Sequence, residues 1–449
     1  MAKAKSKKIA IEEALVPIEE QPYDIPENWC WTRIKYVSDV VTGNTPSKKN
    51  EEYYGGDFPF FKPADLDAGD NVVEASEYLS EEGKNVSRII PKLSTAVCCI
   101  GSIGKSGFLR VEGTTNQQIN SMIPKINPLY LYYYSKTNEF VTELWNKSTA
   151  TTISLVNKNN METNTIPLAP LAEQKRIVEQ IENLFAELDA AREKAEFVIS
   201  CFEERKVAII HKAFDGVLTR KWREANNVSC DSWKMIPLKN CGRWFGGGTP
   251  TTSVGAYWEN GDIPWITSKD MKDRVIEDSI MHITMDGVEN SSANYCDEPA
   301  VLFVMRSGIL RRIFPVCMVN RPFTVNQDLK ACVPTINQEY LYWFCTGYEK
   351  DIRDNCMKSG TTVESVEAKK LMDYEVPVAS ANEQIEVVKQ IEELINKEEI
   401  VKELAENVIE KIDVMKKSIL AKAFRGELGT NIPEEESSIE LLKKMIEEG

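Results

Sequence analysis

The sequence repeats itself once, and this repeat constrains the fold more than any other feature of the chain. The offset between matching segments starts at 204 residues and settles at 210. Repeats of solenoid proteins are only about 20–50 residues long. A period this long therefore indicates a duplicated domain with a connector. The matching segments are Gly43-Asn44-Thr45-Pro46 with Gly247-Gly248-Thr249-Pro250, Asp65 with Asp270, Asn116-Gln117 with Asn326-Gln327, Tyr130-Leu131-Tyr132 with Tyr340-Leu341-Tyr342, Glu173-Gln174 with Glu383-Gln384, and Lys212-Ala213-Phe214 with Lys422-Ala423-Phe424.

Each copy ends in a long segment with the hydrophobic rhythm of a coiled-coil helix. Apolar residues recur at alternating spacings of three and four over residues 177–213 and again over residues 387–423, which is the pattern of a coiled-coil seam. The seam positions in the second copy include Val401, Val408 and Met415. Only Glu398 departs from the pattern, where the first copy has an apolar residue.

The ends of these helices also carry the expected signals. Pro170 suits the first turn of a helix, and Ser380 with Glu383 has the spacing of a capping box. Gly216 and Gly426 follow the last apolar residues, where a left-handed C-cap favours glycine.

A helix over residues 171–214 would be about 65 Å long and could not bury its apolar stripe alone. The other copy is the nearest partner, and homodimerisation of the helices is the alternative. Because only residues 215–230 separate the first helix from the second globular region, we expect the two helices to pair antiparallel.

The globular regions predict a mixed α+β domain. Residues 95–100 and 300–305 are continuous apolar runs typical of buried strands, and helical segments follow near residues 128–145 and 338–356.

Composition narrows the functional classes. No apolar run approaches the roughly 20 residues that span a membrane, and the basic N-terminus lacks the apolar core of a signal peptide. Eleven cysteines without a CxxC pair are typical of reduced thiols in the cytoplasm. With only two histidines, His211 and His282, we expect neither a metal site nor a histidine-based catalytic triad.

The net charge of −15 argues against nucleic-acid binding, but the charge is unevenly distributed. Residues 231–380 hold 20 acidic and 16 basic side chains, whereas residues 381–449 hold 17 and 10. Each globular region can therefore present a basic face.

Two motifs resemble catalytic loops. Gly101–Ser106 ends like a phosphate-binding loop but has two residues between its glycines where four are needed. Asn127-Pro128-Leu129-Tyr130 resembles the target-base loop of amino-methyltransferases. Its counterpart begins Asn337-Gln338, so Pro128 is better interpreted as a helix-start proline.

Several segments together resemble the specificity (S) subunit of a type I restriction-modification system, a defence against foreign DNA. The resemblance covers nearly the whole chain. It is carried by residues 167–178, which open the first long helix, by residues 212–216 and 423–428, which close the two helices, and by residues 13–17, 26–29 and 434–442.

The resemblance implies two duplicated mixed α/β target recognition domains separated by a long antiparallel two-helix coiled coil. The expected boundaries are an N-terminal tail at 1–22, recognition domain 1 at 23–170, helix 1 at 171–216, a linker at 217–230, recognition domain 2 at 231–380, helix 2 at 381–426 and an acidic tail at 427–449.

In this family each recognition domain reads one half of a bipartite, asymmetric site on double-stranded DNA. The resemblance further implies docking of two modification (methyltransferase) subunits and of restriction (translocase and nuclease) subunits. The chain itself would be non-catalytic and cytoplasmic, without a metal or cofactor, and S-adenosylmethionine would bind to the methyltransferase partner. A stand-alone adenine DNA methyltransferase with two recognition domains and a coiled-coil adaptor without a DNA role are the alternatives.

Loop residues that can bond phosphates and base edges are the candidate DNA contacts. In the first copy they are Thr45, Ser47, Lys48, Lys49, Lys62, Lys105, Arg110, Gln117, Lys147, Thr151 and Thr152. In the second copy they are Thr249, Thr251, Thr252, Lys269, Arg306, Arg311, Arg312, Gln327, Lys358, Thr361 and Thr362.

Overall fold

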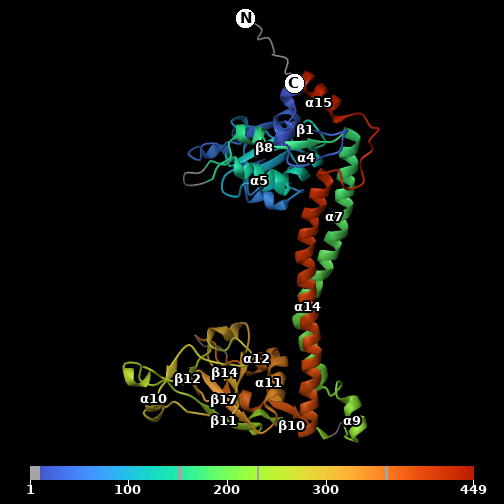
Figure 1. Cartoon of the computed structure of the whole chain (residues 1–449). Coiled ribbons are helices and arrows are strands. Elements are labelled where there is room, and N and C mark those ends of the chain that lie inside the picture. The colour runs from blue at the N-terminus through green and yellow to red at the C-terminus, as the bar shows by residue number, and fades with distance from the viewer. Residues whose placement is uncertain (1–10, 150–153, 230–231, 359–362, 449) are drawn as a thin grey trace. The chain divides into compact units, whose positions relative to one another are not determined.

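The computed structural model describes residues 11–149, 154–229, 232–358 and 363–448. The chain divides into two compact units (Figure 1). Unit 1 comprises Met1–Lys194 with Asn407–Gly449, and unit 2 comprises Ala195–Glu406. Each unit therefore contains one globular region and a part of both long helical segments.

Unit 1 contains three small sheets. The largest is antiparallel with strand order β2-β8-β5-β6, a second has the order β4-β3-β7 with β3 parallel to β7, and the third pairs β1 with β9. The strand bounds are β1 Cys30–Arg33, β2 Ser38–Thr42, β3 Tyr54–Phe61, β4 Glu77–Leu79, β5 Thr95–Cys98, β6 Ser106–Phe108, β7 Thr114–Thr115, β8 Ile119–Pro124 and β9 Thr165–Leu168.

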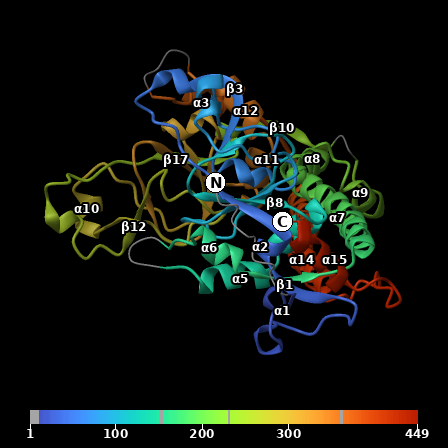
Figure 2. The same cartoon turned by 90° about the horizontal axis from the view of Figure 1, so that it is seen from above.

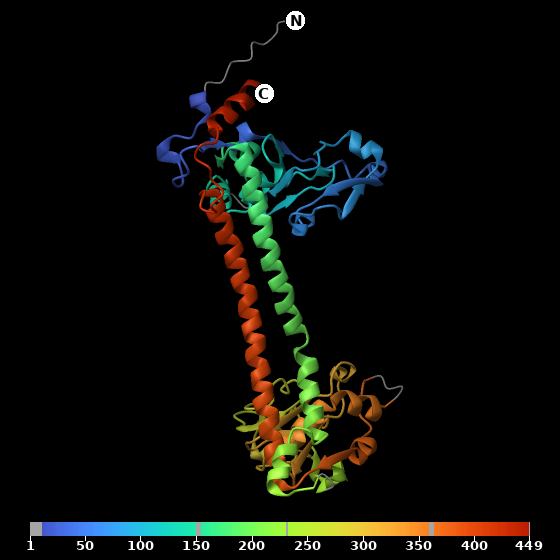
Figure 3. The same cartoon turned by 90° about the vertical axis from the view of Figure 1, so that its right-hand side faces the viewer.

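The helices of unit 1 pack around these sheets, and α15 lies against α1 and α2 near the start of the described chain. Figure 3 shows the C-terminal part of α14 running beside α7. The helix bounds are α1 Ile11–Ala14, α2 Ile34–Val37, α3 Glu81–Asn85, α4 Pro128–Ser135, α5 Asn138–Asn146, α6 Lys158–Glu162, α7 Leu171–Ser200 and α15 Ser438–Glu448.

Unit 2 repeats this topology strand for strand. Its sheets have the orders β11-β17-β14-β15, β13-β12-β16 and β10-β18, and β12 is parallel to β16. The strand bounds are β10 Lys234–Pro237, β11 Gly242–Gly246, β12 Ile263–Ile266, β13 His282–Ile283, β14 Ala300–Val304, β15 Val316–Val319, β16 Thr324–Val325, β17 Leu329–Pro334 and β18 Glu375–Val378. The duplication inferred from the sequence is thus a duplication of fold.

Within unit 2, α10 and α9 lie at opposite edges (Figures 1 and 2). The helix bounds are α8 Phe202–Phe214, α9 Arg220–Asn226, α10 Met285–Glu289, α11 Gln338–Gly347, α12 Glu349–Cys356, α13 Ala368–Asp373 and α14 Ala381–Phe424.

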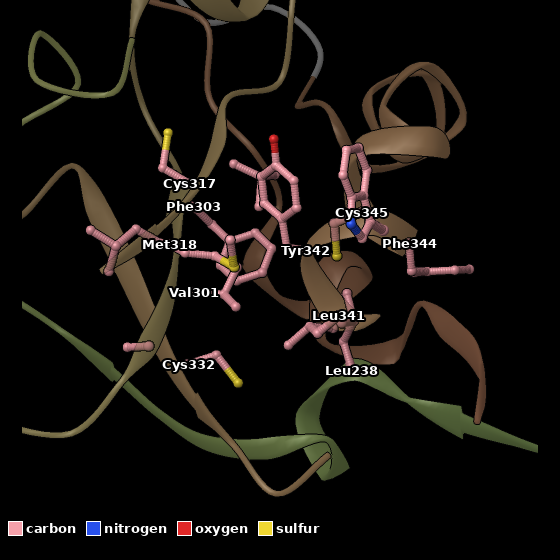
Figure 4. Close-up of a cluster of buried hydrophobic side chains, with 14 of the residues drawn as sticks. Leu238, Val301, Phe303, Cys317, Met318, Cys332, Leu341, Tyr342, Phe344 and Cys345 are labelled. Atoms are coloured by element: carbon pink, nitrogen blue, oxygen red, sulfur yellow. The ribbon is translucent and has the colours of Figure 1, made fainter. Parts of the chain in front are cut away.

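The predicted apolar strands form the centre of each core. Every residue of β5 and of β14 is buried. In unit 2, side chains of β14 and β15 such as Phe303 and Met318 belong to one buried cluster with Leu341 of α11 (Figure 4). The mixed α+β prediction is therefore confirmed, with the helices and sheets sharing one apolar interior.

The long helices pair antiparallel in both units, as expected. In unit 1, Asp189 and Arg192 of α7 form ion pairs with Lys416 and Asp413 of α14, so the order of the partners is reversed. In unit 2, Arg205 of α8 pairs with Glu398 at 2.6 Å. The residue that interrupts the apolar pattern thus has a cationic partner.

The first helical segment is not continuous, contrary to the prediction. It is interrupted at Cys201 between α7 and α8, whereas α14 runs unbroken for 44 residues. The guanidinium of Arg205 donates a hydrogen bond to the Val198 carbonyl at 3.0 Å. Carbonyls at the end of a helix lack an intrahelical donor. The Arg205 side chain supplies such a donor, and this stabilises the break.

The buried seam is also narrower than the heptad pattern predicted. Ala405 and Ile412 are buried, but Val401, Val408 and Met415 are 42–50% exposed. These three positions of α14 therefore lie outside the contact with the first helical segment. Among the described residues, no helix is long and apolar enough to cross a membrane.

Both glycine C-caps are confirmed, because Gly216 and Gly426 have positive φ angles of 73° and 76°. The phenylalanine two residues before each glycine packs the helix end against aromatic rings. Phe424 packs edge-on against Tyr130 at 4.9 Å, and Phe214 packs in the same way against Tyr340 at 4.9 Å. The end of each long helical segment is therefore held by a globular region.

The expected capping box at Ser380 is replaced by another contact. The Glu383 carboxylate is buried and accepts hydrogen bonds from Thr219 at 2.9 Å and Arg223 at 2.7 Å. The equivalent Glu173 accepts one from the Trp29 indole at 2.7 Å. These glutamates hold neighbouring segments in place, and they do not serve their own helix N-termini.

Candidate nucleic-acid interface

The two strongest repeat motifs meet in the same way in both units. In unit 1, the Thr45 hydroxyl donates a hydrogen bond to the side-chain carbonyl of Gln117. In unit 2, Thr249 donates to Gln327 at 2.5 Å. We call each of these threonine–glutamine pairs a clamp. In unit 1 the clamp joins the loop after β2 to the loop before β8. In unit 2 it joins the loop after β11 to the loop before β17.

Glycine is required for this close approach. A Cβ atom on Gly43 would lie 2.2 Å from the carbonyl oxygen of Thr115, and one on Gly247 would lie 1.6 Å from that of Val325. No side chain fits at such distances. The repeated glycine is therefore explained by the backbone crossing under the clamp.

The buried asparagine before each clamp glutamine shapes its loop. Asn116 and Asn326 accept hydrogen bonds from the backbone N–H two residues later, both at 3.1 Å. This is an Asx turn. Its effect is to leave the adjacent Gln117 and Gln327 exposed.

Strand direction brings further candidates to the same end of each sheet. Because β5 is antiparallel to β8, and β14 to β17, the loops after β5 and β14 leave the sheet at the end where the clamp lies. Lys105 follows β5, and Arg306, Arg311 and Arg312 follow β14. We call this edge, with its clamp, the clamp end of the sheet.

A lysine that follows the central strand of each three-stranded sheet also lies near the clamp end. The Asn116 N–H donates to the Phe61 carbonyl at 3.2 Å, beside Lys62, and the Asn326 N–H donates to Ile266 at 3.0 Å, three residues before Lys269. The repeated aspartates close these loops, since Asp65 accepts from the Lys62 backbone and Asp270 from the Thr267 backbone, both at 2.7 Å. Asp65 and Asp270 are thus structural.

The segments that contain Lys147 and Lys358 also reach this end. Ile100 forms a β-bridge with Leu155, and Arg306 forms one with Ser365, which places the segments that contain Lys147 and Lys358 beside the loops after β5 and β14. Four candidates in these segments, Thr151, Thr152, Thr361 and Thr362, lie outside the described residues.

Unit 2 has a basic cavity at its clamp end. It measures about 570 Å³, and its polar lining includes Arg306, Gln327, Lys330 and Lys358. Arg306 pairs with Asp328 at 3.0 Å, yet its side chain is 60% exposed. The cavity can therefore receive an anionic or hydrogen-bond-accepting group.

Unit 1 has different chemistry at the equivalent places. Ile100 and Asn120 stand where unit 2 has Arg306 and Lys330. Asn120 is buried and bonded, accepting from Thr42 at 2.7 Å and donating to the Cys99 sulfur at 3.3 Å. The clamps are the same, but their surroundings differ.

Several candidate cations are already paired with carboxylates. Lys62 lies 2.6 Å from Glu77, Lys105 2.6 Å from Asp67, Lys147 2.7 Å from Glu143, and Arg311 3.0 Å from Glu364. Arg110 follows β6 and therefore leaves the sheet at the other end, where it pairs with Asp70 at 3.5 Å.

The remaining candidates are exposed. Within the described part of the chain, none of the following cations forms an ion pair: Lys48, Lys49, Lys269, Lys358 and Arg312. Ser47, Thr251 and Thr252 are exposed hydroxyl neighbours on the clamp loops. These side chains are available to an incoming polyanion.

The possible catalytic groups are engaged in structural contacts. His211 contacts the Gly347 carbonyl at 2.9 Å, and His282 pairs with Asp278 at 2.8 Å. Burial raises the pKa of Cys99, Cys317 and Cys332 to about 12, so these thiols stay protonated. The described residues contain no cluster of His, Cys, Asp or Glu able to hold a metal ion.

Sequence reasoning missed Lys330, and it missed the structural role of Glu173 and Glu383. The repeated Glu-Gln pair was visible, but its partners come from distant segments. The signal for Lys330 was a single charge within an otherwise apolar strand.

Comparison with known proteins identifies the family. A model described as "Type I restriction modification DNA specificity domain" matches residues 26–196 and 231–411. The chain is 22% identical to the EcoKI specificity subunit of Escherichia coli strain K12, over 90% of both chains. It is 37% identical to the EcoR124I/EcoR124II specificity subunit of Escherichia coli over a shorter stretch, 35% of this chain and 39% of that protein.

Solved structures share the fold. The HsdS subunit from Thermoanaerobacter tengcongensis matches with a TM-score of 0.61 and 18% identity, over 92% of this chain and all of that one. A chain from a study of the assembly and conformational transition of the type I R-M system matches with a TM-score of 0.65, 18% identity and 91% coverage of this chain. The protein therefore belongs to the type I restriction-modification DNA specificity family, as a non-catalytic subunit with two recognition domains.

Proposed function

We propose that the recognition domains at residues 23–170 and 231–380 each read one half of a bipartite, asymmetric DNA target. The observation that carries this proposal is the convergence of candidate contacts from separate segments at the clamp end of each four-stranded sheet. Polar and cationic side chains gathered at one edge can follow a DNA backbone and reach into a groove.

Residues that the two units share suit contacts to phosphates, and residues that differ between them suit contacts to bases. Contacts to phosphates fix the register of a protein on DNA, whereas contacts to base edges supply specificity. The clamps Thr45–Gln117 and Thr249–Gln327 are common to both units, which suits a positioning role. Arg306 and Lys330 differ from Ile100 and Asn120, which suits different half-sites.

Pairing with carboxylates does not exclude a cation from the interface. In the ion pair of Arg306 with Asp328 the two side chains are 60% and 25% exposed, and a pair open to solvent contributes only about 0–1 kcal/mol. A phosphate or a guanine edge can replace Asp328 as its partner.

The outward apolar positions of the long helices support docking of other subunits. Leu404 is 59% exposed and Val414 is 67% exposed, although α14, on which both lie, is otherwise rich in charge. We propose that two modification (methyltransferase) subunits cover such positions, that they bind S-adenosylmethionine, and that restriction subunits join the complex. The assembly would act in the cytoplasm, where its DNA is.

Alanine substitutions in the basic cavity test the proposal. Arg306→Ala and Lys330→Ala, assembled with the methyltransferase, should each weaken DNA binding or change one half of the methylated sequence. A lost phosphate contact lowers the salt slope by about one, and a lost bidentate contact to guanine costs about 1–3 kcal/mol of discrimination at one base pair.

Lys239→Ala is the matched control, because Lys239 is an exposed cation of unit 2 that pairs with Asp373 away from the cavity. Binding should be measured against salt concentration, and methylated sites should be mapped. Wild-type affinity and methylation pattern in both cavity variants would refute the proposed interface.

A further inference from the structure

One side chain fastens the recognition domain of unit 2 to its long helix. The guanidinium of Arg274 pairs with Glu392 of α14 at 2.5 Å. It also lies over two rings of α11, with its central carbon 4.8 Å from the centre of Trp343 and 5.5 Å from that of Tyr342. It pairs in addition with Glu339 of α11 at 3.1 Å. Arg274 therefore occupies a pocket built from two carboxylates and two aromatic rings.

Unit 1 has a glycine at the same structural position. The carbonyl of Arg274 accepts the Met318 N–H at 2.8 Å, and the carbonyl of Gly69 accepts the Phe108 N–H at 2.8 Å. Met318 and Phe108 are equivalent, because they pair with Val301 and Thr95 in matching strands. Unit 1 therefore lacks the arginine of unit 2.

Three of the four receiving side chains are nevertheless present in unit 1, and only Glu339 is replaced, by Leu129. With the offset of 210 residues, Tyr132, Tyr133 and Glu182 are the counterparts of Tyr342, Trp343 and Glu392. They line a cavity of about 670 Å³ between α4 and the long helices, and Gly69 lies at its wall. The place filled by Arg274 in unit 2 is thus open in unit 1.

We propose that this cavity of unit 1 binds an arginine side chain supplied by another polypeptide. The guanidinium would lie over Tyr133 and pair with Glu182, as Arg274 lies over Trp343 and pairs with Glu392 in unit 2. Planar guanidinium groups favour this combination of ring stacking and a carboxylate partner. The inference does not depend on the DNA-recognition proposal.

The electrostatics of the cavity favour a cation over an anion. Among the described residues, Glu182 has no ion-pair partner, and its negative charge together with burial raises the pKa of Tyr133. Three lysines line the cavity: Lys416 is paired with Asp189 at 2.5 Å, and Lys417 is exposed to solvent. The third, Lys136, lies over the Tyr132 ring at 5.8 Å, and burial lowers its pKa.

The arginines nearest the cavity are already engaged. Arg110 pairs with Asp70 and lies over the Phe108 ring at 4.8 Å, and Arg192 pairs with Asp413. Glu182, Ala186 and Asp189 on the rim are exposed. An arginine from a second chain can therefore reach the cavity.

N-ethylguanidinium is a direct probe of this site. Crystals of the full chain soaked in the probe should show it between Tyr133 and Glu182. In the Arg274→Ala variant a second molecule should appear between Trp343 and Glu392, because the substitution opens the equivalent pocket. In solution, saturation-transfer NMR should show that Glu182→Gln weakens binding about tenfold, since the carboxylate supplies the charge-assisted hydrogen bonds.

Glu187→Gln is the matched control, because Glu187 is exposed on the same helix and does not line the cavity. Its affinity for the probe should equal that of the wild type. Propylammonium and inorganic phosphate serve as competitors. An empty cavity in soaked wild-type crystals, equal affinity for propylammonium, or phosphate in place of the probe would each overturn the proposal.

Discussion

At the scale of single residues, the two copies share a buried glutamate, but its hydrogen-bond partners differ between them. Glu173 and Glu383 are both completely buried. Glu173 accepts hydrogen bonds from Trp29 and from Asn431 in the C-terminal tail, at 2.7 and 2.9 Å. Glu383 instead holds Arg223, whose side chain is 6% exposed. Each acid thus fixes a segment that follows one of the long helical segments.

Glu383→Gln should strongly destabilise unit 2. Removing one partner of a buried ion pair leaves an uncompensated charge, which costs about 3–5 kcal/mol. The free energy of unfolding, measured with chemical denaturant, should fall by about that amount. Glu224→Gln is the matched control, because Glu224 pairs with Arg220 at side-chain exposures of 65% and 77%, and its loss should cost less than about 0.5 kcal/mol.

A change of similar size in both variants would mean that the Arg223–Glu383 pair contributes no more than a surface pair.

At the scale of elements, the sequence predicted what depends on local chemistry. The glycine caps, the helix-start residue Pro128 and the antiparallel pairing were predictable from spacing and turn preferences. The break at Cys201 was not, because it depends on Arg205 reaching both the Val198 carbonyl and Glu398 of another helix. Contacts between distant segments leave no local signature.

The C-terminal segment offers a pH-dependent example of such a contact. Arg176 of α7 donates two hydrogen bonds to Glu435, at 2.9 and 2.7 Å, and thereby lowers the pKa of that carboxyl. A lowered folded-state pKa means that the stabilisation is present above the ordinary value of 4.5. It is lost as the pH falls through the lowered pKa.

Glu435→Gln should therefore reduce the free energy of unfolding at neutral pH by less than about 1 kcal/mol, because the pair is partly exposed. The difference between variant and wild type should shrink as the pH falls below 4.5. Denaturant titrations at several pH values measure it. A difference independent of pH would show that the carboxylate charge is not what holds the tail.

At the scale of the whole molecule, the repeat predicted two copies of one fold, and both units have the same strand orders. It also selected clamp residues that meet in space, although Thr45 and Gln117 are 72 positions apart. What it could not predict was the difference between the copies. Arg274 and Gly69 share a backbone position, but their contrast is visible only once strand registers align them.

Two similar units with different side chains at their clamp ends should be separable readers of DNA. Replacing residues 231–380 with the matching region of another family member should change one half of the methylated sequence and leave the other half unchanged. The physical reason is that each clamp, with its surrounding side chains, lies within one unit, so the exchange leaves every described contact around Thr45 and Gln117 intact. Both β10 and β18 lie within the exchanged residues, so their two-stranded sheet is transferred intact. Mapping methylated sites in cells that carry the hybrid and its methyltransferase decides the outcome. A folded, active hybrid in which both halves change would contradict the assignment of one domain to one half-site.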